Sequence, residues 1–253
     1  MSNPRVYLCT GNEDAKYVNI VIENLLVELK TSGKTPLLIS IGKPPFSTGP
    51  LKTQQKESGL KYFDYYTGAK IPTIELSDLA QHLSDTKRRD FFISEESKLD
   101  EIYLYGASPR IDIMRIMVDE LILFIKRDAS SSSWVYNVVK QLMDKNKDAG
   151  IDIVTTGVNH LEEAAIFFSN LREEIASLLG RSVKMAFSGF IKFNIDHLNA
   201  ALSSGKTIIE LFNGGQFHGM IRYILRNLPR NVDIVHEESF LSRLGSYIDK
   251  NPV

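Results

Sequence analysis

The sequence predicts an α/β fold, with one doubly wound, mostly parallel sheet of about six to eight strands and helices on both faces. Two observations support this. Short apolar runs alternate along the chain with longer segments that repeat apolar residues at helical spacing. The joints between these segments are short, as in strand–helix–strand units, which build parallel sheets. The first unit, residues 6–41, also has a polar turn directly after its first strand, where α/β proteins place ligands.

The first unit has the clearest pattern. Residues 6–9 form an unbroken apolar run typical of a central strand. Asn12 is expected to cap the next helix, and Gly33 to end it. Residues 36–41 are the expected second strand. The buried face of the helix is expected to comprise Val18, Val21, Ile22, Leu25 and Leu29.

The middle of the chain is less regular. Glycines and prolines break residues 42–73, which also carry an aromatic cluster of Tyr62, Phe63, Tyr65 and Tyr66. We interpret this part as a loop lid packed by its own aromatics, with a partner-binding surface as the alternative. A short helix capped by Ser77 follows over residues 77–83. Residues 91–93 favour a short strand, and residues 101–105 a further strand that ends at Gly106.

The remaining elements follow in alternation, and they indicate one domain over residues 1–253. The serine run 130–133 is interpreted as a loop and helix cap rather than a linker, because apolar residues continue after it at helical spacing. The Gly214-Gly215 pair is expected to separate two helical pieces. The expected elements are helical turns around Ile111, Met114, Met117 and Val118, strands at 120–125, 151–157 and within 183–191, and helices from Trp134, at 161–179, at 194–202 and at 207–228.

Composition excludes several classes of protein. Hydrophobic residues make up 43% of the chain and charged residues 24%, so a sizeable core can form. The net charge of −1 gives no indication of a nucleic-acid surface, and we expect no nucleic-acid partner. Cys9, the single cysteine, excludes an internal disulfide and is expected to be a buried, inert thiol. No stretch has the length of a transmembrane span, and residues 1–5 lack an apolar signal region, so we expect a cytoplasmic protein.

Common catalytic signatures are missing. The five histidines lack ligand spacing, and one cysteine cannot build a thiolate metal site. The hydrolase motif G-x-S-x-G is absent, since Phe187-Ser188-Gly189 lacks the preceding glycine. Of the dinucleotide fingerprint G-x-G-x-x-G, only Gly11 follows the first strand.

Several segments nevertheless match one family in order and spacing. Thr10-Gly11 and the helix over 24–34 lead into Leu37-Leu38-Ile39, as a phosphate loop leads to a second strand. Residues 119–125 with the serine run, residues 154–158, 186–191 with Asp196, and 198–207 match later motifs. Over residues 5–230 the chain therefore resembles the MinD/ParA group of deviant-Walker P-loop ATPases. Within that group it resembles the FlhG (YlxH)-type regulators of flagellar number most closely. The resemblance implies a P-loop NTPase-like fold.

The departures from the family fall on its catalytic positions. By resemblance, Gly11, Asn12, Lys16 and Tyr17 form a vestigial phosphate loop, in which residues 12–15 replace the glycine-rich run. Lys16 occupies the Walker lysine place, whereas Tyr17 replaces the hydroxyl residue that binds Mg²⁺. The family's carboxylates after the second and third strands have no counterpart in residues 40–42 or 105–109.

Charge also opposes a nucleotide in this loop. Glu13 and Asp14 stand where phosphates would lie, and each pair of like charges at ~5 Å costs roughly 3 kcal/mol at an effective dielectric of ~20. The same side chains favour the N-terminus of the helix directly. We therefore expect a non-catalytic pseudo-ATPase that binds no cofactor.

Two alternatives stay open. One is a working or nucleotide-binding ATPase that uses ATP and Mg²⁺ through Lys16. The other is an unrelated doubly wound enzyme or small-molecule binder with its ligand near Gly11, Gly42 and Gly106. For the pseudo-ATPase, the resemblance implies protein partners in flagellar or cell-pole assembly, a homodimer, and a location at the periphery of the inner membrane.

The last residues, 237–253, form an expected amphipathic tail. Its apolar face comprises Phe240, Leu241, Leu244 and Ile248. Packing of this face on the domain is the preferred interpretation, because flanking glutamates weaken attraction to anionic lipid. Weak contact with a membrane surface is the alternative.

Overall fold

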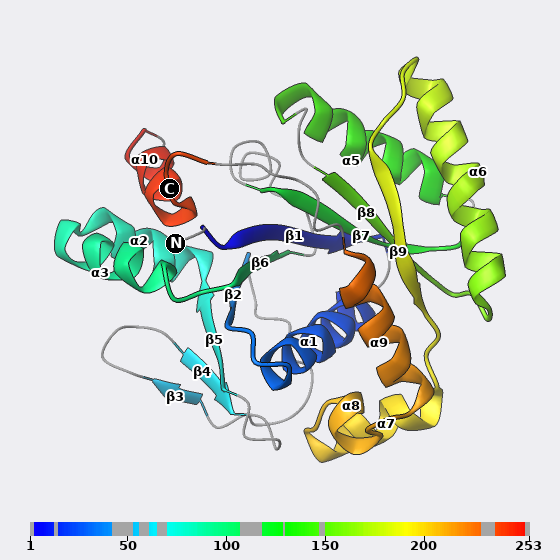
Figure 1. Cartoon of the computed structure of the whole chain (residues 1–253), viewed down its shortest axis with the longest axis horizontal. Coiled ribbons are helices and arrows are strands. Elements are labelled where there is room, and N and C mark those ends of the chain that lie inside the picture. The colour runs from blue at the N-terminus through cyan, green and yellow to red at the C-terminus, as the bar shows by residue number, and fades with distance from the viewer. Residues whose placement is uncertain are drawn as a thin grey trace.

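The computed structural model describes residues 3–12, 15–41, 53–55, 61–64, 70–106, 118–128, 130–146, 150–228 and 236–250. These residues form one nine-stranded sheet in the order β3-β4-β5-β2-β6-β1-β7-β8-β9, with helices on both faces (Figure 1). The predicted doubly wound α/β fold is therefore confirmed. The strands are β1 Arg5–Gly11, β2 Pro36–Ser40, β3 Thr53–Gln55, β4 Lys61–Asp64, β5 Lys70–Glu75, β6 Glu101–Tyr105, β7 Glu120–Lys126, β8 Gly150–Thr156 and β9 Met185–Ile191.

Seven of the strands, from β5 to β9 in sheet order, pair in parallel. The strand β1 lies between β6 and β7, with Leu8 opposite Leu104 on one side and Leu121 on the other. The chain first builds the sheet on the β6 side of β1 and then continues on the β7 side. This reversal makes the carboxyl end of β1 the topological switch point, where doubly wound proteins bind their ligands.

The edge of the sheet beside β5 differs from the prediction. Tyr62 and Phe63 lie in β4, which pairs antiparallel with β3 and β5, so they are not in a loop. These short strands were not predicted because prolines and glycines around them interrupt the alternating pattern that indicates a strand. Tyr65 and Tyr66 lie outside the described residues.

One face of the sheet is covered by α1 Ala15–Thr31, α7 Ile195–Ser204, α8 Ile208–Leu211 and α9 Gln216–Asn227. All five predicted buried residues of α1 lie in this core. Gly33, with φ +85°, follows the helix, and the N–H of Lys34 donates to Leu29 O at 3.0 Å, as expected for a glycine stop. Gly214-Gly215 separates α8 from α9, as predicted.

The other face is covered by α2 Leu76–Ser84, α3 Thr86–Glu96, α5 Ser131–Lys145, α6 Leu161–Leu179 and α10 Phe240–Lys250. The predicted strand at 91–93 is wrong, because these residues lie in α3, which Asp85 caps by accepting from the N–H groups of Lys87 and Arg88. The predicted Ser77 cap is also wrong, since Ser77 lies inside α2 and Glu75 occupies the cap position. The predicted turns at 111–117 lie outside the described residues.

The C-terminal helix α10 is part of the core. Phe240, Leu241, Leu244 and Ile248 are all buried against α2 and α3. The buried carboxylate of Glu96 accepts from the N–H groups of Phe240 at 2.8 Å and Leu241 at 3.0 Å, and so caps the helix. The packed interpretation of this segment is therefore confirmed, and its apolar face is not available to a membrane. Among the described residues, no helix is long and apolar enough to cross a bilayer.

Two carboxyl groups are buried in the middle of the sheet, on the α1 side. Asp152 of β8 accepts the Ser188 hydroxyl at 2.5 Å, and its other oxygen has no hydrogen-bond partner among the described residues. Burial raises the pKa of Asp152 to about 7. Burial and then the Asp152 charge raise the pKa of Glu120 to about 8. Burial also raises the pKa of Cys9, so this thiol is buried and inert as predicted.

Candidate functional site

The candidate site lies at the carboxyl edge of the parallel strands, where β1 meets α1. Gly11 is the last residue of β1 and pairs with Phe124 of β7. A Cβ added at Gly11 would lie 2.7 Å from Phe124 O and 2.8 Å from Val18 Cγ2. Glycine is therefore required here by the close approach of α1 to β7. This requirement holds whether or not a ligand binds.

Asn12 fixes the turn after β1 through hydrogen bonds to the end of β7 and the start of α5. Its N–H donates to Phe124 O at 3.2 Å, and its side-chain oxygen accepts from the Lys126 N–H at 2.8 Å. Its side-chain amide donates to Ser131 Oγ at 3.0 Å. The predicted cap of α1 by Asn12 is wrong, because α1 begins only at Ala15, and the Asn12 side chain bonds to the end of β7 and the start of α5.

The serine run, residues 130–133, adds further hydrogen bonds beside Asn12. Asp128 accepts from the Ser130 N–H at 2.9 Å and from the Ser130 hydroxyl at 2.7 Å. The hydrogen bond from the Ser130 hydroxyl, then those from the Ser131 hydroxyl and the Ser130 N–H, lower the pKa of Asp128. The Ser131 hydroxyl has one proton, which it can donate to Asp128 Oδ1 or to Lys126 O, both within hydrogen-bond distance. The run is thus a turn and helix start, as predicted, and it fixes the β7–α5 joint against Asn12.

The other predicted loop residues are only partly placed. Tyr17 is half-buried in the first turns of α1, and its ring lies 5.1 Å from that of Phe193. Lys16 lies in α1, but its side chain is outside the described part of the structure, as are residues 13–14. The structure thus brings Gly11, Asn12 and Tyr17 to one edge of the sheet.

A cavity of about 350 Å³ opens beside this turn, at the carboxyl ends of β7, β8 and β9. Lys126 and Lys192 supply positive charge, and the Tyr17 and Phe193 rings, tilted by 43° to each other, supply aromatic surface. Chemically, this combination suits an anionic ligand with a planar group. The cavity is lined by Tyr17, Lys126, Gly157, Val158, Asn159, Lys192, Phe193 and Ile195.

Sequence reasoning missed most of this lining. Lys126, Asn159 and Lys192 each follow closely on a predicted strand, at the edge where ligands bind. Their position after a strand was the signal that could have found them. Asp196, which matches a family acidic residue, lies exposed in the first turn of α7 and does not line the cavity.

Among the described residues, this edge offers few groups that could hold a metal ion or a phosphate. Among the described residues, no three His, Cys, Asp or Glu side chains gather to hold a metal ion. Ser40 and Ile41 at the end of β2, and Tyr105 and Gly106 at the end of β6, supply no carboxylate. The Asn12 N–H and the Lys126 N–H, which face this turn, already donate within the protein.

No protein-family model and no curated protein sequence matches the chain. Solved structures match closely in fold. A ParA-family ATPase from Chlorobium tepidum TLS shares a TM-score of 0.60 at 14% identity, covering 88% of this chain and 98% of that chain. MinD in the MinC:MinD cell division complex of Aquifex aeolicus gives 0.62 at 14% identity, covering 88% and 95%. The ParA of pNOB8 bound to nonspecific DNA gives 0.58 at 12% identity, covering 88% and 98%.

At these identities the similarity shows the fold alone. The seven-stranded parallel sheet with helices on both faces is the fold of the ParA and MinD P-loop ATPases. One of these structures holds DNA, so the absence of a nucleic-acid partner for this chain stays a prediction. The chain therefore has the ParA/MinD fold.

Proposed function

We propose that this protein is a pseudo-ATPase of the ParA/MinD fold, which hydrolyses no ATP and acts through contacts with other proteins. The observation that supports the proposal is the set of hydrogen bonds that Asn12 makes to β7 and α5. A phosphate loop binds because successive backbone N–H groups converge on the ligand, and glycines give the loop that shape. In this chain, the N–H of Asn12 donates to Phe124 O instead, and the Asn12 side chain holds this residue against Lys126 and Ser131.

Charge supports the same proposal. Glu13 and Asp14 follow Asn12 in sequence and add two negative charges to the segment that would hold phosphates. A nearby Mg²⁺ would offset such charges, but the described ends of β2 and β6 offer no carboxylate to hold one. A chain that cannot place the metal and the phosphates loses the electrostatic stabilisation on which phosphoryl transfer depends.

Calorimetric titration with Mg-ATP and Mg-ADP tests this proposal. We expect no heat of binding and no phosphate release, and Lys16→Ala should behave like the parent protein. Low-micromolar binding of either nucleotide, weakened by Lys16→Ala, would overturn the proposal. Lys184→Ala, at an exposed position before β9, is the matched control for loss of one lysine.

A second candidate is nucleotide binding without hydrolysis, and the cavity lined by Tyr17, Phe193 and two lysines favours it. Its two lysines and paired rings lie at the switch-point edge, where a base and an anionic group would fit. If this function holds, ADP should bind without magnesium, and Lys126→Ala or Lys192→Ala should weaken it. Unchanged affinity in both variants would exclude this cavity as the nucleotide site.

The partners are a proposal from the resemblance. We infer an FlhG-like role, with protein partners in flagellar or cell-pole organisation and a homodimer. One similar structure is MinD in complex with MinC, which makes protein partners plausible for this fold. Light scattering after gel filtration tests the dimer, and a single mass of about 29 kDa at all concentrations would exclude it. A cytoplasmic location and the absence of DNA binding stay predictions of the same proposal.

A further inference from the structure

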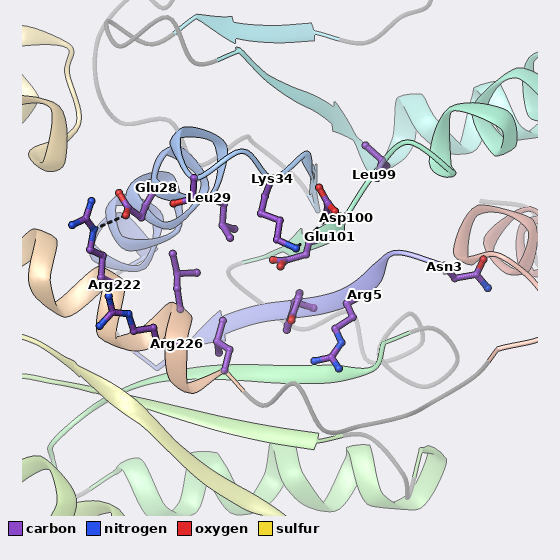
Figure 2. Close-up of a pocket in the computed structure, with 14 residues that line it drawn as sticks. Asn3, Arg5, Glu28, Leu29, Lys34, Leu99, Asp100, Glu101, Arg222 and Arg226 are labelled. Carbon is purple, nitrogen blue, oxygen red and sulfur yellow. Dashed lines mark hydrogen bonds and ion pairs between the residues drawn. The ribbon is translucent and has the colours of Figure 1, made fainter. Parts of the chain in front are cut away.

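A second, larger cavity lies at the amino ends of the strands, away from the turn after β1. Its volume is about 690 Å³, within the range of small-molecule sites. Figure 2 shows its walls: the start of β1, the end of α1 with the following turn, the turn before β6, and the last turns of α9. None of its lining residues belongs to the site discussed above, so the inference does not depend on the proposed function.

Cationic side chains come to this cavity from three directions. Arg5 comes from β1, Lys34 from the turn after α1, and Arg222 and Arg226 from α9 (Figure 2). Arg222 donates to Glu28 Oε1 at 2.6 Å and is thereby held. Arg226 makes no ion pair or hydrogen bond with any residue that the structure describes. Its charge is therefore available to a ligand.

The carboxylates that line the cavity are already engaged. Glu28 accepts from Arg222 and lies 2.8 Å from His218 Nε2. Asp100 accepts from the Thr35 N–H at 2.7 Å and lies 3.8 Å from Lys34 Nζ. Glu101 accepts from the Tyr103 hydroxyl at 2.7 Å. Each carboxylate keeps lone pairs that can accept further hydrogen bonds from hydroxyl groups of a ligand.

These groups define the chemistry of a ligand. Guanidinium and ammonium groups bind phosphate, whereas carboxylates accept from sugar hydroxyls. Most of the lining residues are charged or polar, although four leucines also line the cavity, so a polar ligand fits it better than a wholly apolar one. We propose that this cavity binds a small phosphorylated polyol, such as a sugar phosphate, with the phosphate at Arg226 and hydroxyl groups at Asp100 and Glu101.

The test must distinguish phosphate binding by Arg226 from stabilisation of its own helix. Arg226 lies in the last turn of α9, where any cation also stabilises the helix through its dipole. Arg226→Lys keeps this stabilising charge but loses the paired N–H groups that bind phosphate in a fork. Arg226→Glu reverses the charge. Arg181, exposed in the turn after α6, provides the matched control substitution Arg181→Glu.

Titration calorimetry with ribose 5-phosphate, inorganic phosphate, sulfate and ribose tests the proposal. We expect saturable binding of one ribose 5-phosphate per chain, weaker binding of phosphate, and none of ribose. Arg226→Lys should weaken ribose 5-phosphate binding by about tenfold, which corresponds to loss of one charge-assisted hydrogen bond, and Arg226→Glu should abolish it. Arg181→Glu should bind like the parent protein.

Three results would overturn the proposal. One is the absence of saturable binding at millimolar ribose 5-phosphate in folded protein. Another is equal affinity for sulfate, phosphate and ribose 5-phosphate, which would indicate general anion attraction only. The third is binding that Lys126→Ala weakens and the Arg226 variants do not, which would assign the ligand to the other cavity. None of these results bears on whether the protein hydrolyses ATP.

Discussion

Replacing Asp152 with asparagine should change how stability depends on pH. Asp152 is fully buried in β8, and burial raises its pKa from 3.8 to about 7. Between these values the carboxyl keeps its proton in the folded protein and loses it in the unfolded chain. The folded state then binds more protons, so the free energy of unfolding falls as pH rises. Asparagine has nearly the same shape and does not titrate, so it removes this contribution.

The size of the effect follows from the pKa values. One such group lowers the free energy of unfolding by about 1.4 kcal/mol per pH unit, or about 4 kcal/mol between pH 4 and pH 7. Glu120, with a pKa raised to about 8, contributes a second slope of the same sign. Between pH 5 and 7 we therefore expect the free energy of unfolding of the parent protein to fall about twice as steeply with pH as that of Asp152→Asn.

Urea unfolding followed by circular dichroism at pH 5, 6, 7 and 8, at constant ionic strength, measures these slopes. The quantity to compare is the difference between variant and parent, which should grow in favour of the variant as pH rises. Asp90→Asn, at an exposed position on α3, is the control and should follow the parent curve. If Asp152→Asn keeps the parent slope, Asp152 is ionised in the folded protein, and the reasoning from burial is wrong.

Two further predictions concern packing. Leu244→Ala should lower the free energy of unfolding by about 2–5 kcal/mol, because Leu244 of α10 is 1% exposed and packs against α2 and α3. Ser246→Ala, at an exposed position of the same helix, should have little effect in the same urea assay. Gly189→Ala should cost about 1–3 kcal/mol, since Gly189 has φ +145° and its Cβ would lie 2.8 Å from Ile224 Cγ1; an unchanged melting temperature would contradict this.

Much of the fold could be predicted because its central strands are buried on both faces and its helices carry clear apolar stripes. The strand at 120–125 and the helix at 161–179 are examples, and the structure has both. Prediction failed where local pattern and tertiary context differ. Phe91-Phe92-Ile93 has strand-forming residues, but the Asp85 cap starts a helix there, and only Phe92 is buried.

The sequence indicates where the candidate site lies in the fold but not how its residues are bonded. The position of Gly11 after the first strand fixed its location, since topology brings that turn to the switch point. The role of Asn12 could not be predicted, because its partners Lys126 and Ser131 are more than 110 residues away in sequence. The amino-end cavity was missed for the same reason: Arg5, Lys34 and Arg226 meet only in the folded chain.

The attachment of α10 has a consequence for synthesis of the protein on the ribosome. Glu96 is buried by a helix that begins 144 residues later, and Asp119 lies 2.7 Å from His236 Nε2, 117 residues later. Until residues 236–250 emerge from the ribosome, the Glu96 carboxylate and the apolar sides of α2 and α3 stay open to solvent. Such late closure exposes aggregation-prone surface during translation. We expect nascent chains that stop before residue 236 to be held by chaperones rather than released as folded protein.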